Sequence, residues 1–488
     1  MTVTQLPAPA SKTALLAVVC LAQFMVILDV AIVNVALPSI DDGLHFSTAG
    51  LQWVVNAYTL TFAGFLMLGG RSADLLGRRR VFLAGTAVFA LSSLACALAD
   101  TQGLLIGARA LQGIGGAIVS PATLSIIISS LREGPERNRG LGLWGAMGAL
   151  GASSGALIGG LLTQGLGWKA IFAVNAPLGL AIIVLGLRVI PPSRAHDGPR
   201  HFDASGAVLV TAGLVALTFG IVRTETLGWG SPGVLAPLAA GLVLLAAFLL
   251  VEGRVARVPL VPLSIFRRGQ LRIANLVIVL LYAGFFPVWF FLTIYLQQVL
   301  HYDAITAGVA FLPMTLSIFA ASSLAPRVVG RFGARPVIAI GMSAAAVGML
   351  MLTTVEPGGA YFGPILAGAL LTALGMGFSL VPSTIVAMQG VVGSQSGVAS
   401  GLLNTSRLMG GALGLAVLST IADARTHSVV GVSAARALTD GFQLAFGVGA
   451  LLAVAGAVVA ATLLRAQASD AIAPDAAPAE AEPETVAA

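Results

Sequence analysis

Two charged residues lie inside long apolar segments, where a charge needs a partner or a function. Asp29 falls in the middle of the apolar run 13–38, and Arg109 falls in the run 103–130. An acidic group at the centre of a membrane-spanning helix costs about 2.5–3.5 kcal/mol on insertion scales. Asp29 is therefore predicted to be either a proton-binding carboxylate or a packing carboxylate paired to a neighbour.

Arg109 is a candidate partner of Asp29. An arginine cannot release a proton at ordinary pH, so its part in proton transfer is limited to setting the charge around a nearby carboxylate. The alternative is a structural arginine whose N–H groups are satisfied by backbone carbonyls. Gln112 shares a helical face with Arg109, at an offset of three residues, and would join the same site.

A short basic hinge joins the apolar runs 51–70 and 81–99. Its glycines and charged residues are Gly70, Arg71, Asp74, Gly77, Arg78, Arg79 and Arg80. The glycines permit a tight chain reversal, and Asp74 is the only acid among the arginines. We expect Asp74 and these arginines to form a latch that is made in one conformation and broken in another.

A stripe of glycines runs along one face of the apolar run 140–164. Its members are Gly148, Gly151, Gly155 and Gly159. Small residues at offsets of three and four let two helices approach closely in a membrane. The stripe therefore predicts a tight helix–helix contact.

Other polar and aromatic side chains within apolar runs are candidates for a substrate cavity. They are Asn34, Gln112, Tyr282, Phe286, Trp289, Thr293, Asn404 and Arg407. Aromatic walls bind flat, apolar or cationic ligands by stacking and cation–π contact. Packing in the core or in an interfacial belt is an equally good interpretation of each aromatic residue, and a structural role is the alternative for Asn404 and Arg407.

The composition identifies the class of protein that holds these residues. Of the 488 residues, 57% are hydrophobic and only 9% are charged, and the mean hydropathy is +0.96. Soluble proteins carry roughly a quarter charged residues, so a polytopic membrane protein is predicted. The five histidines are expected in loops, and neither they nor the two cysteines predict a metal site.

Fourteen apolar segments are long enough to cross a bilayer. They are 13–38, 51–70, 81–99, 103–130, 140–164, 170–190, 204–223, 233–252, 271–299, 305–325, 336–354, 361–388, 396–421 and 440–465. With the amino terminus inside, the inner loops carry twenty Lys and Arg residues and the outer loops carry four. This asymmetry predicts that both termini are cytoplasmic.

An internal repeat divides the chain. Gly330–Arg335 occupies the place in the second half that the basic hinge holds in the first, with Gly330 where Asp74 would be. The predicted parts are a cytoplasmic N-terminus (1–12), a six-helix bundle (13–190), a linker with two inserted helices (191–270), a second six-helix bundle (271–465) and a disordered cytoplasmic tail (466–488). Such repeats place a substrate site near the bilayer midplane, between the bundles.

Several of these motifs resemble those of one family. The pattern Gly-x-x-x-Asp-x-x-Gly-Arg-Arg at 70–79 resembles the loop between spans two and three of the major facilitator superfamily. The segments 28–38 and 109–115 and the glycine stripe resemble motifs of its fourteen-span drug:proton antiporters, and 168–172 resembles the opening of their span six. The chain departs from that pattern at Ala31, where a threonine is common, and at Ala156, where a proline is usual.

The resemblance implies an all-α major facilitator fold and a proton-coupled antiporter. Such a protein exports drugs, antibiotics or amphiphilic metabolites across the bacterial inner membrane by alternating access. An exporter of a lipid or of one dedicated endogenous metabolite is the alternative. The resemblance also assigns proton transfer to Arg109.

No other class of protein fits the residues as well. A membrane enzyme would need a catalytic cluster within the spans, and no such group of residues is found there. The basic residues flank the spans, where membrane orientation explains them without a nucleic-acid partner. We expect a monomer in the lipid bilayer that needs no cofactor or metal and whose only ligands are protons and a small amphiphilic substrate.

Overall fold

The computed structural model shows an all-helical protein. It describes residues 12–46, 48–192, 203–254, 269–302, 304–391, 395–429 and 431–465. Within these ranges every regular element is a helix. The predicted N-terminal segment 1–12, apart from Lys12, and the predicted tail 466–488 lie outside the described residues, as do 193–202 and 255–268 of the predicted linker.

The helices of the first half precede two further helices. They are α1 (Lys12–Leu44), α2 (Thr48–Leu76), α3 (Arg78–Ala97), α4 (Gln102–Ser130), α5 (Pro135–Leu166), α6 (Lys169–Ala173) and α7 (Asn175–Val189), followed by α8 (Ala204–Leu227) and α9 (Pro232–Arg254). The second half contains α10 (Gly269–Ile294), η2 (Tyr295–Val299), α11 (Ala304–Ala310), α12 (Leu312–Phe332), α13 (Ala334–Leu352), η3 (Tyr361–Ile365), α14 (Leu366–Met388), α15 (Ser396–Ser428) and α16 (Ala434–Leu463).

These helices make up the fourteen predicted spans, because α6 with α7, α10 with η2, α11 with α12, and η3 with α14 each form one span. In the described residues thirteen helices are long and apolar enough to cross a membrane, and α5 passes as a bent pair, which makes fourteen. Several helices extend beyond the predicted apolar runs, because hydropathy identifies the residues in the hydrocarbon layer and not the ends of a helix. For this reason His427, predicted in a loop, lies in the last turn of α15.

The two halves repeat one local structure at their basic turns. Gly77 has a φ of 94° between α2 and α3, and Gly333 has a φ of 81° between α12 and α13. Non-glycine residues rarely adopt this left-handed region, so glycine is needed at both turns. The turn that repeats in the two halves therefore depends on the same left-handed glycine conformation in each.

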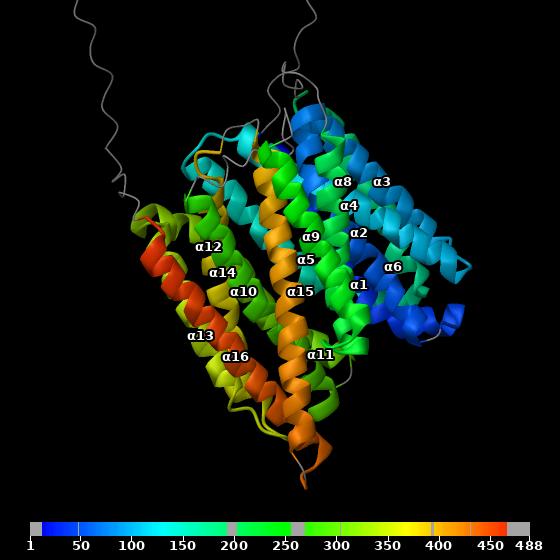
Figure 1. Cartoon of the computed structure of the whole chain (residues 1–488), viewed down its shortest axis with the longest axis vertical. Coiled ribbons are helices and arrows are strands. Elements are labelled where there is room, and N and C mark those ends of the chain that lie inside the picture. Colours follow the sequence, from blue (N-terminus) through cyan, green and yellow to red (C-terminus); the bar gives the residue numbers. More distant parts are fainter. Residues whose placement is uncertain are drawn as a thin grey trace, which may run out of the picture.

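The halves lie side by side, and α8 and α9 run along their flank (Figure 1). α8 packs against α2 of the first half and α15 of the second. The Trp53 ring on α2 lies 6.2 Å from that of Phe219 on α8, and Trp229 donates a 2.7 Å hydrogen bond to Thr420 Oγ1 on α15. The inserted pair therefore touches both halves.

Candidate functional site

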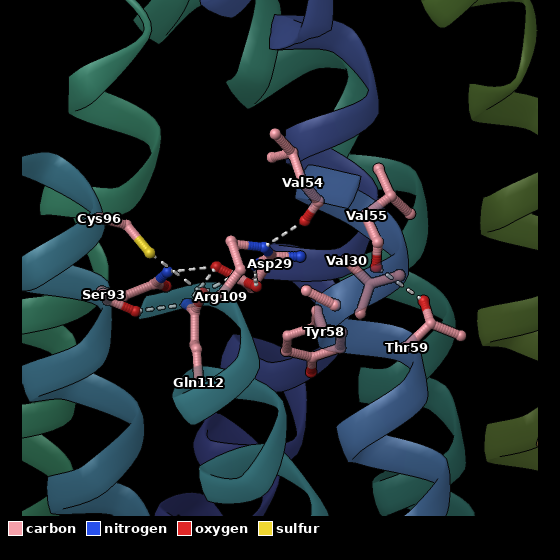
Figure 2. Close-up of polar contacts among 12 residues, drawn as sticks. Asp29, Val30, Val54, Val55, Tyr58, Thr59, Ser93, Cys96, Arg109 and Gln112 are labelled. Atoms are coloured by element: carbon pink, nitrogen blue, oxygen red, sulfur yellow. Dashed lines mark hydrogen bonds and ion pairs between the residues drawn. The ribbon is translucent and has the colours of Figure 1, made fainter. Parts of the chain in front are cut away.

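Asp29 is fully buried on α1, where this helix packs against α4, α5 and α7. Its Oδ2 lies 2.7 Å from Nη1 of Arg109 on α4, and the arginine is 1% exposed. Figure 2 shows the two side chains pointing toward each other between the helices. The pairing expected from the sequence is therefore present as a hydrogen-bonded ion pair shielded from solvent.

Two amides complete the shell of the carboxylate. Gln112 Nε2 and Asn175 Nδ2 donate to Asp29 Oδ1 at 2.7 and 2.8 Å. Gln112 is itself held by Arg109, which donates to Gln112 Oε1 at 2.7 Å, and by Ser93 Oγ at 2.5 Å (Figure 2). Asp29 thus accepts three hydrogen bonds from three different side chains, as an ionised carboxylate does.

Arg109 also ties α4 to its neighbours. Its Nε donates to the Val54 carbonyl of α2 at 2.9 Å. The guanidinium lies 4.4 Å from the centre of the Tyr58 ring and 5.7 Å from that of Phe172. The aromatic faces and the carbonyl fix the plane of the guanidinium, so its charge is held in one place.

A buried ion pair of this kind responds strongly to the charge of either member. Its attraction offsets the loss of hydration only while both charges are present, and removal of one partner typically costs about 3–5 kcal/mol. A proton added to Asp29 would leave Arg109 without its counter-charge. Protonation would therefore weaken the contact that Asp29 and Arg109 make between α1 and α4.

Six members of this cluster were not among the predicted site residues. They are Val54, Tyr58, Ser93, Cys96, Phe172 and Asn175. Asn175 carried a sequence signal, because it lies in the apolar run 170–190, where a buried amide needs partners. Val54 acts through its carbonyl, so no property of its side chain points to this role.

The basic hinge binds the second half of the chain through Asp74. The Asp74 carboxylate accepts hydrogen bonds from the backbone N–H groups of Gly397 at 3.0 and 3.1 Å and of Val398 at 3.2 Å. These two residues form the first turn of α15, where unpaired N–H groups and the helix dipole favour a negative charge. We call this contact the Asp74 latch.

Further contacts join the halves around the Asp74 latch. Arg78 Nε donates to Ser125 Oγ on α4 at 2.9 Å, and that hydroxyl lies 2.7 Å from Ser396 Oγ on α15. A Cβ on Gly70 would collide with the Gly397 carbonyl, so glycine is needed for this approach. Arg79 stays within the first half, where it donates to the Leu187 carbonyl.

We expect Asp74→Asn to slow turnover about fivefold without changing substrate affinity. The attraction of a carboxylate to a helix N-terminus is worth about 1 kcal/mol when partly buried, and this energy shifts a two-state equilibrium about fivefold. Transport rate and binding constant measured on the same preparation test this. Asp100→Asn is the control, because Asp100 forms an exposed ion pair with Lys169 within the first half. A tenfold change in affinity at normal turnover would contradict the prediction.

The glycine stripe of α5 lies against α1. A Cβ on Gly151 would be 2.9 Å from the Phe24 carbonyl oxygen, and one on Gly159 would be 2.9 Å from the Ile32 side chain. At Gly155 an added Cβ would overlap the Ala31 side chain and lie 3.0 Å from the Ile32 amide nitrogen. Gly148 is looser, with the Gln23 amide 3.9 Å away. α5 therefore packs on the α1 face next to Asp29.

We predict that Gly155→Ala lowers the thermal stability of the protein, because the new methyl group must push α1 and α5 apart. Overpacking of this kind costs about 1–3 kcal/mol. Gly160→Ala on the same helix is the matched control, since an added Cβ there meets nothing within 4 Å. Melting temperatures in one detergent measure both. Equal melting temperatures for the two variants would show that the stripe is not a packing surface.

The predicted cavity residues fall into separate groups. Gln112 belongs to the Asp29 cluster, whereas Asn34 is exposed on α1 and donates to the Val30 carbonyl at 3.1 Å. On α10, Phe286 is 47% exposed, Trp289 stacks on Phe311 with ring centres 4.7 Å apart, and Thr293 donates to the Trp289 carbonyl.

The remaining three candidates, Tyr282, Asn404 and Arg407, lie near the contact between the halves. Asn404 Oδ1 accepts a 3.4 Å hydrogen bond from Ser120 of α4. Arg407 stacks on Trp144 of α5, and Tyr282 lies on α10, which packs against α15.

The chain thus has two halves of helices that can span a membrane, with a buried ion pair inside the first half. Residues 19–415 match the model of the Major Facilitator Superfamily, and the chain belongs to this family. It is a multi-pass protein of the cell membrane, and the family consists of transporters rather than enzymes.

Relatives and solved structures agree with this assignment. The chain is 42% identical to the cephamycin export protein CmcT of Amycolatopsis lactamdurans, covering 85% of this chain and 86% of the relative. It is 40% identical to the puromycin resistance protein pur8 of Streptomyces alboniger, covering 90% and 89%. The human organic anion transporter MFSD10 shares the fold with a TM-score of 0.65 at 15% identity, covering 92% of this chain and 99% of that one.

Proposed function

We propose that this protein is a proton-coupled antiporter that exports antibiotics or related amphiphilic molecules from the bacterial cytoplasm. The observation that carries the proposal is the ion pair of Asp29 and Arg109, whose side chains are 0% and 1% exposed within the first half. The export direction and the substrate class are supported by the cephamycin and puromycin relatives.

The arginine-rich turns are placed at the cytoplasmic face in this proposal, and both termini lie on that side. The Asp74 latch then holds the cytoplasmic face closed, and its release opens the substrate site to the cytoplasm. Proton loading at Asp29 weakens the ion pair with Arg109 and drives the change between these two states.

The energy available to one proton is sufficient for export. A membrane potential near 100 mV supplies about 2.3 kcal/mol per charge, and one pH unit adds about 1.4 kcal/mol. One proton can therefore sustain a gradient of several hundredfold for a neutral substrate. For a monovalent cation exchanged against one proton the charges cancel, and only the pH difference remains, about tenfold.

Transport by proteoliposomes tests the proposal. A radiolabelled cephamycin, which carries a carboxylate, and radiolabelled puromycin, which does not, are the two test substrates, with an imposed pH gradient and an internal pH-sensitive dye. We expect the gradient to stimulate transport, and substrate movement to drive protons in the opposite direction. Liposomes without protein and liposomes treated with nigericin are the controls. Transport that is equal with and without the gradient, with no countermovement of protons, would rule out antiport.

A further inference from the structure

Arg407 is a second cation within the spans, and it lies where the two halves meet. It belongs to α15, in the interior of the helix. Its guanidinium carbon lies 4.8 Å from the ring centre of Trp144 on α5, in the other half. Its Nη2 donates a 2.9 Å hydrogen bond to Thr384 Oγ1 on α14. The side chain is thus fixed on one side by a ring and on another by a hydroxyl.

Arg407 differs from Arg109 in its charge environment. No carboxylate among the described residues forms an ion pair with Arg407, and its Nε is buried without a hydrogen-bond partner. Arg407 is partly buried, and a ring and one hydroxyl satisfy only some of its guanidinium donors. An anion supplied from outside the chain would satisfy both the charge and the unused donors.

Trp144 of the first half and Thr384 of the second contact this cation, and further polar groups lie on the same or neighbouring helices. Asn404 lies one turn before Arg407 on α15 and accepts from Ser120 of the first half at 3.4 Å. The Trp144 ring lies against the Arg407 guanidinium. Its own N–H donates to Thr123 at 2.9 Å, and the residue is 1% exposed. A ligand at this place contacts the two halves together, as a substrate site must if each half is to expose it to a different side.

We propose that Arg407 binds an anionic group, a carboxylate, on the exported substrate. The planar guanidinium presents parallel N–H donors that match the two oxygens of a carboxylate. The substrate class is therefore an amphiphile with an apolar body and one carboxylate. This inference rests on the proposed export function, because it assigns the ligand of the same transporter.

Binding of a matched pair of probes tests the inference. The probes are N-dansyl-6-aminohexanoic acid and its methyl ester, which share an apolar body and differ in the negative charge. Fluorescence titration of the purified protein in a neutral detergent gives both affinities. We expect the wild type to bind the acid at least tenfold more tightly than the ester. Arg407→Gln should lose this preference by weakening the acid alone, and Arg407→Lys should keep part of it.

Arg223→Gln is the matched control. Arg223 also makes a cation–π contact, 4.9 Å from the ring centre of Phe219, but it is exposed on α8. This variant should bind both probes as the wild type does. Melting temperatures identify a misfolded Gln variant, and in that case the wild type and Arg407→Lys still decide the result.

Three outcomes would overturn the inference: equal affinities of the wild type for acid and ester, absence of acid binding, or a preference that survives Arg407→Gln. Titration in nanodiscs separates the substrate from a lipid phosphate. If anionic lipid displaces the acid and zwitterionic lipid does not, the site belongs to a lipid headgroup and the inference fails. If the preference for the acid depends on Arg407 but transport is not driven by protons, the inference stands and proton antiport is refuted. If puromycin is transported by proton exchange but the acid is not preferred, proton antiport stands and the inference is refuted.

Discussion

Asp29→Asn is expected to reduce proton-driven efflux to the level of empty liposomes while the protein still binds substrate. Asparagine keeps the volume of the side chain but cannot exchange a proton at physiological pH. The charge next to the Arg109 guanidinium then stays the same throughout the transport cycle, so the pH gradient cannot drive a change at this site. Downhill exchange of substrate, which needs no proton, should continue.

Asp29→Asn leaves Arg109 without its counter-charge, so we expect this variant to be less stable than the wild type, and its new amide group needs hydrogen-bond partners. An asparagine at position 29 would turn its NH₂ toward the donors of Gln112 or Asn175 unless one of these amides rotates. Asn175 Oδ1 is buried without a hydrogen-bond partner, so a flip of the Asn175 amide supplies the missing acceptor. Efflux into an imposed pH gradient, at matched protein levels and with Asp100→Asn as the control, measures the effect. Normal gradient-driven efflux by Asp29→Asn would exclude Asp29 from coupling.

The fold could be predicted from the sequence because the bilayer constrains it. Each span needs about twenty apolar residues, and the arginines mark the turns. The positive φ of Gly77 and of Gly333 explains why the repeated turn keeps a glycine even though Asp74 has no counterpart in the second half. The sequence did not predict that α8 contacts both halves, since the neighbours of an apolar helix surface cannot be inferred from its residues.

Of the candidate site, the pairing of the charged residues was the part that could be predicted from the sequence. Asp29 and Arg109 were expected to meet because charges in a membrane need partners, and they lie 2.7 Å apart. Ser93 and Asn175 give weaker signals, because hydroxyls and amides are tolerated in many helix contacts. Asp74 binds the backbone N–H group of Gly397. Almost every residue type has such a group, so the sequence could not identify this partner.

Arg109 offers a test of whether the two charges act as one unit. Arg109→Ala leaves the Asp29 carboxylate buried with only two amide donors, so we expect a loss of about 3–5 kcal/mol in stability. Arg109→Lys keeps a positive charge but lacks the planar fork that reaches the Val54 carbonyl and Asp29 together. It should therefore retain more stability than the alanine variant and only a small fraction of proton-driven transport.

The double variant Asp29→Asn/Arg109→Ala separates stability from coupling. Removal of the charge at position 29 also removes the penalty of an unpaired carboxylate, so the melting temperature should recover most of what Arg109→Ala loses. Proton-driven transport should not recover, because the proton-binding group is absent. Melting temperatures and efflux rates of the wild type, both single variants and the double variant complete the cycle. If the two effects on stability simply add, Asp29 and Arg109 are not energetically coupled, and the proton must act on another group.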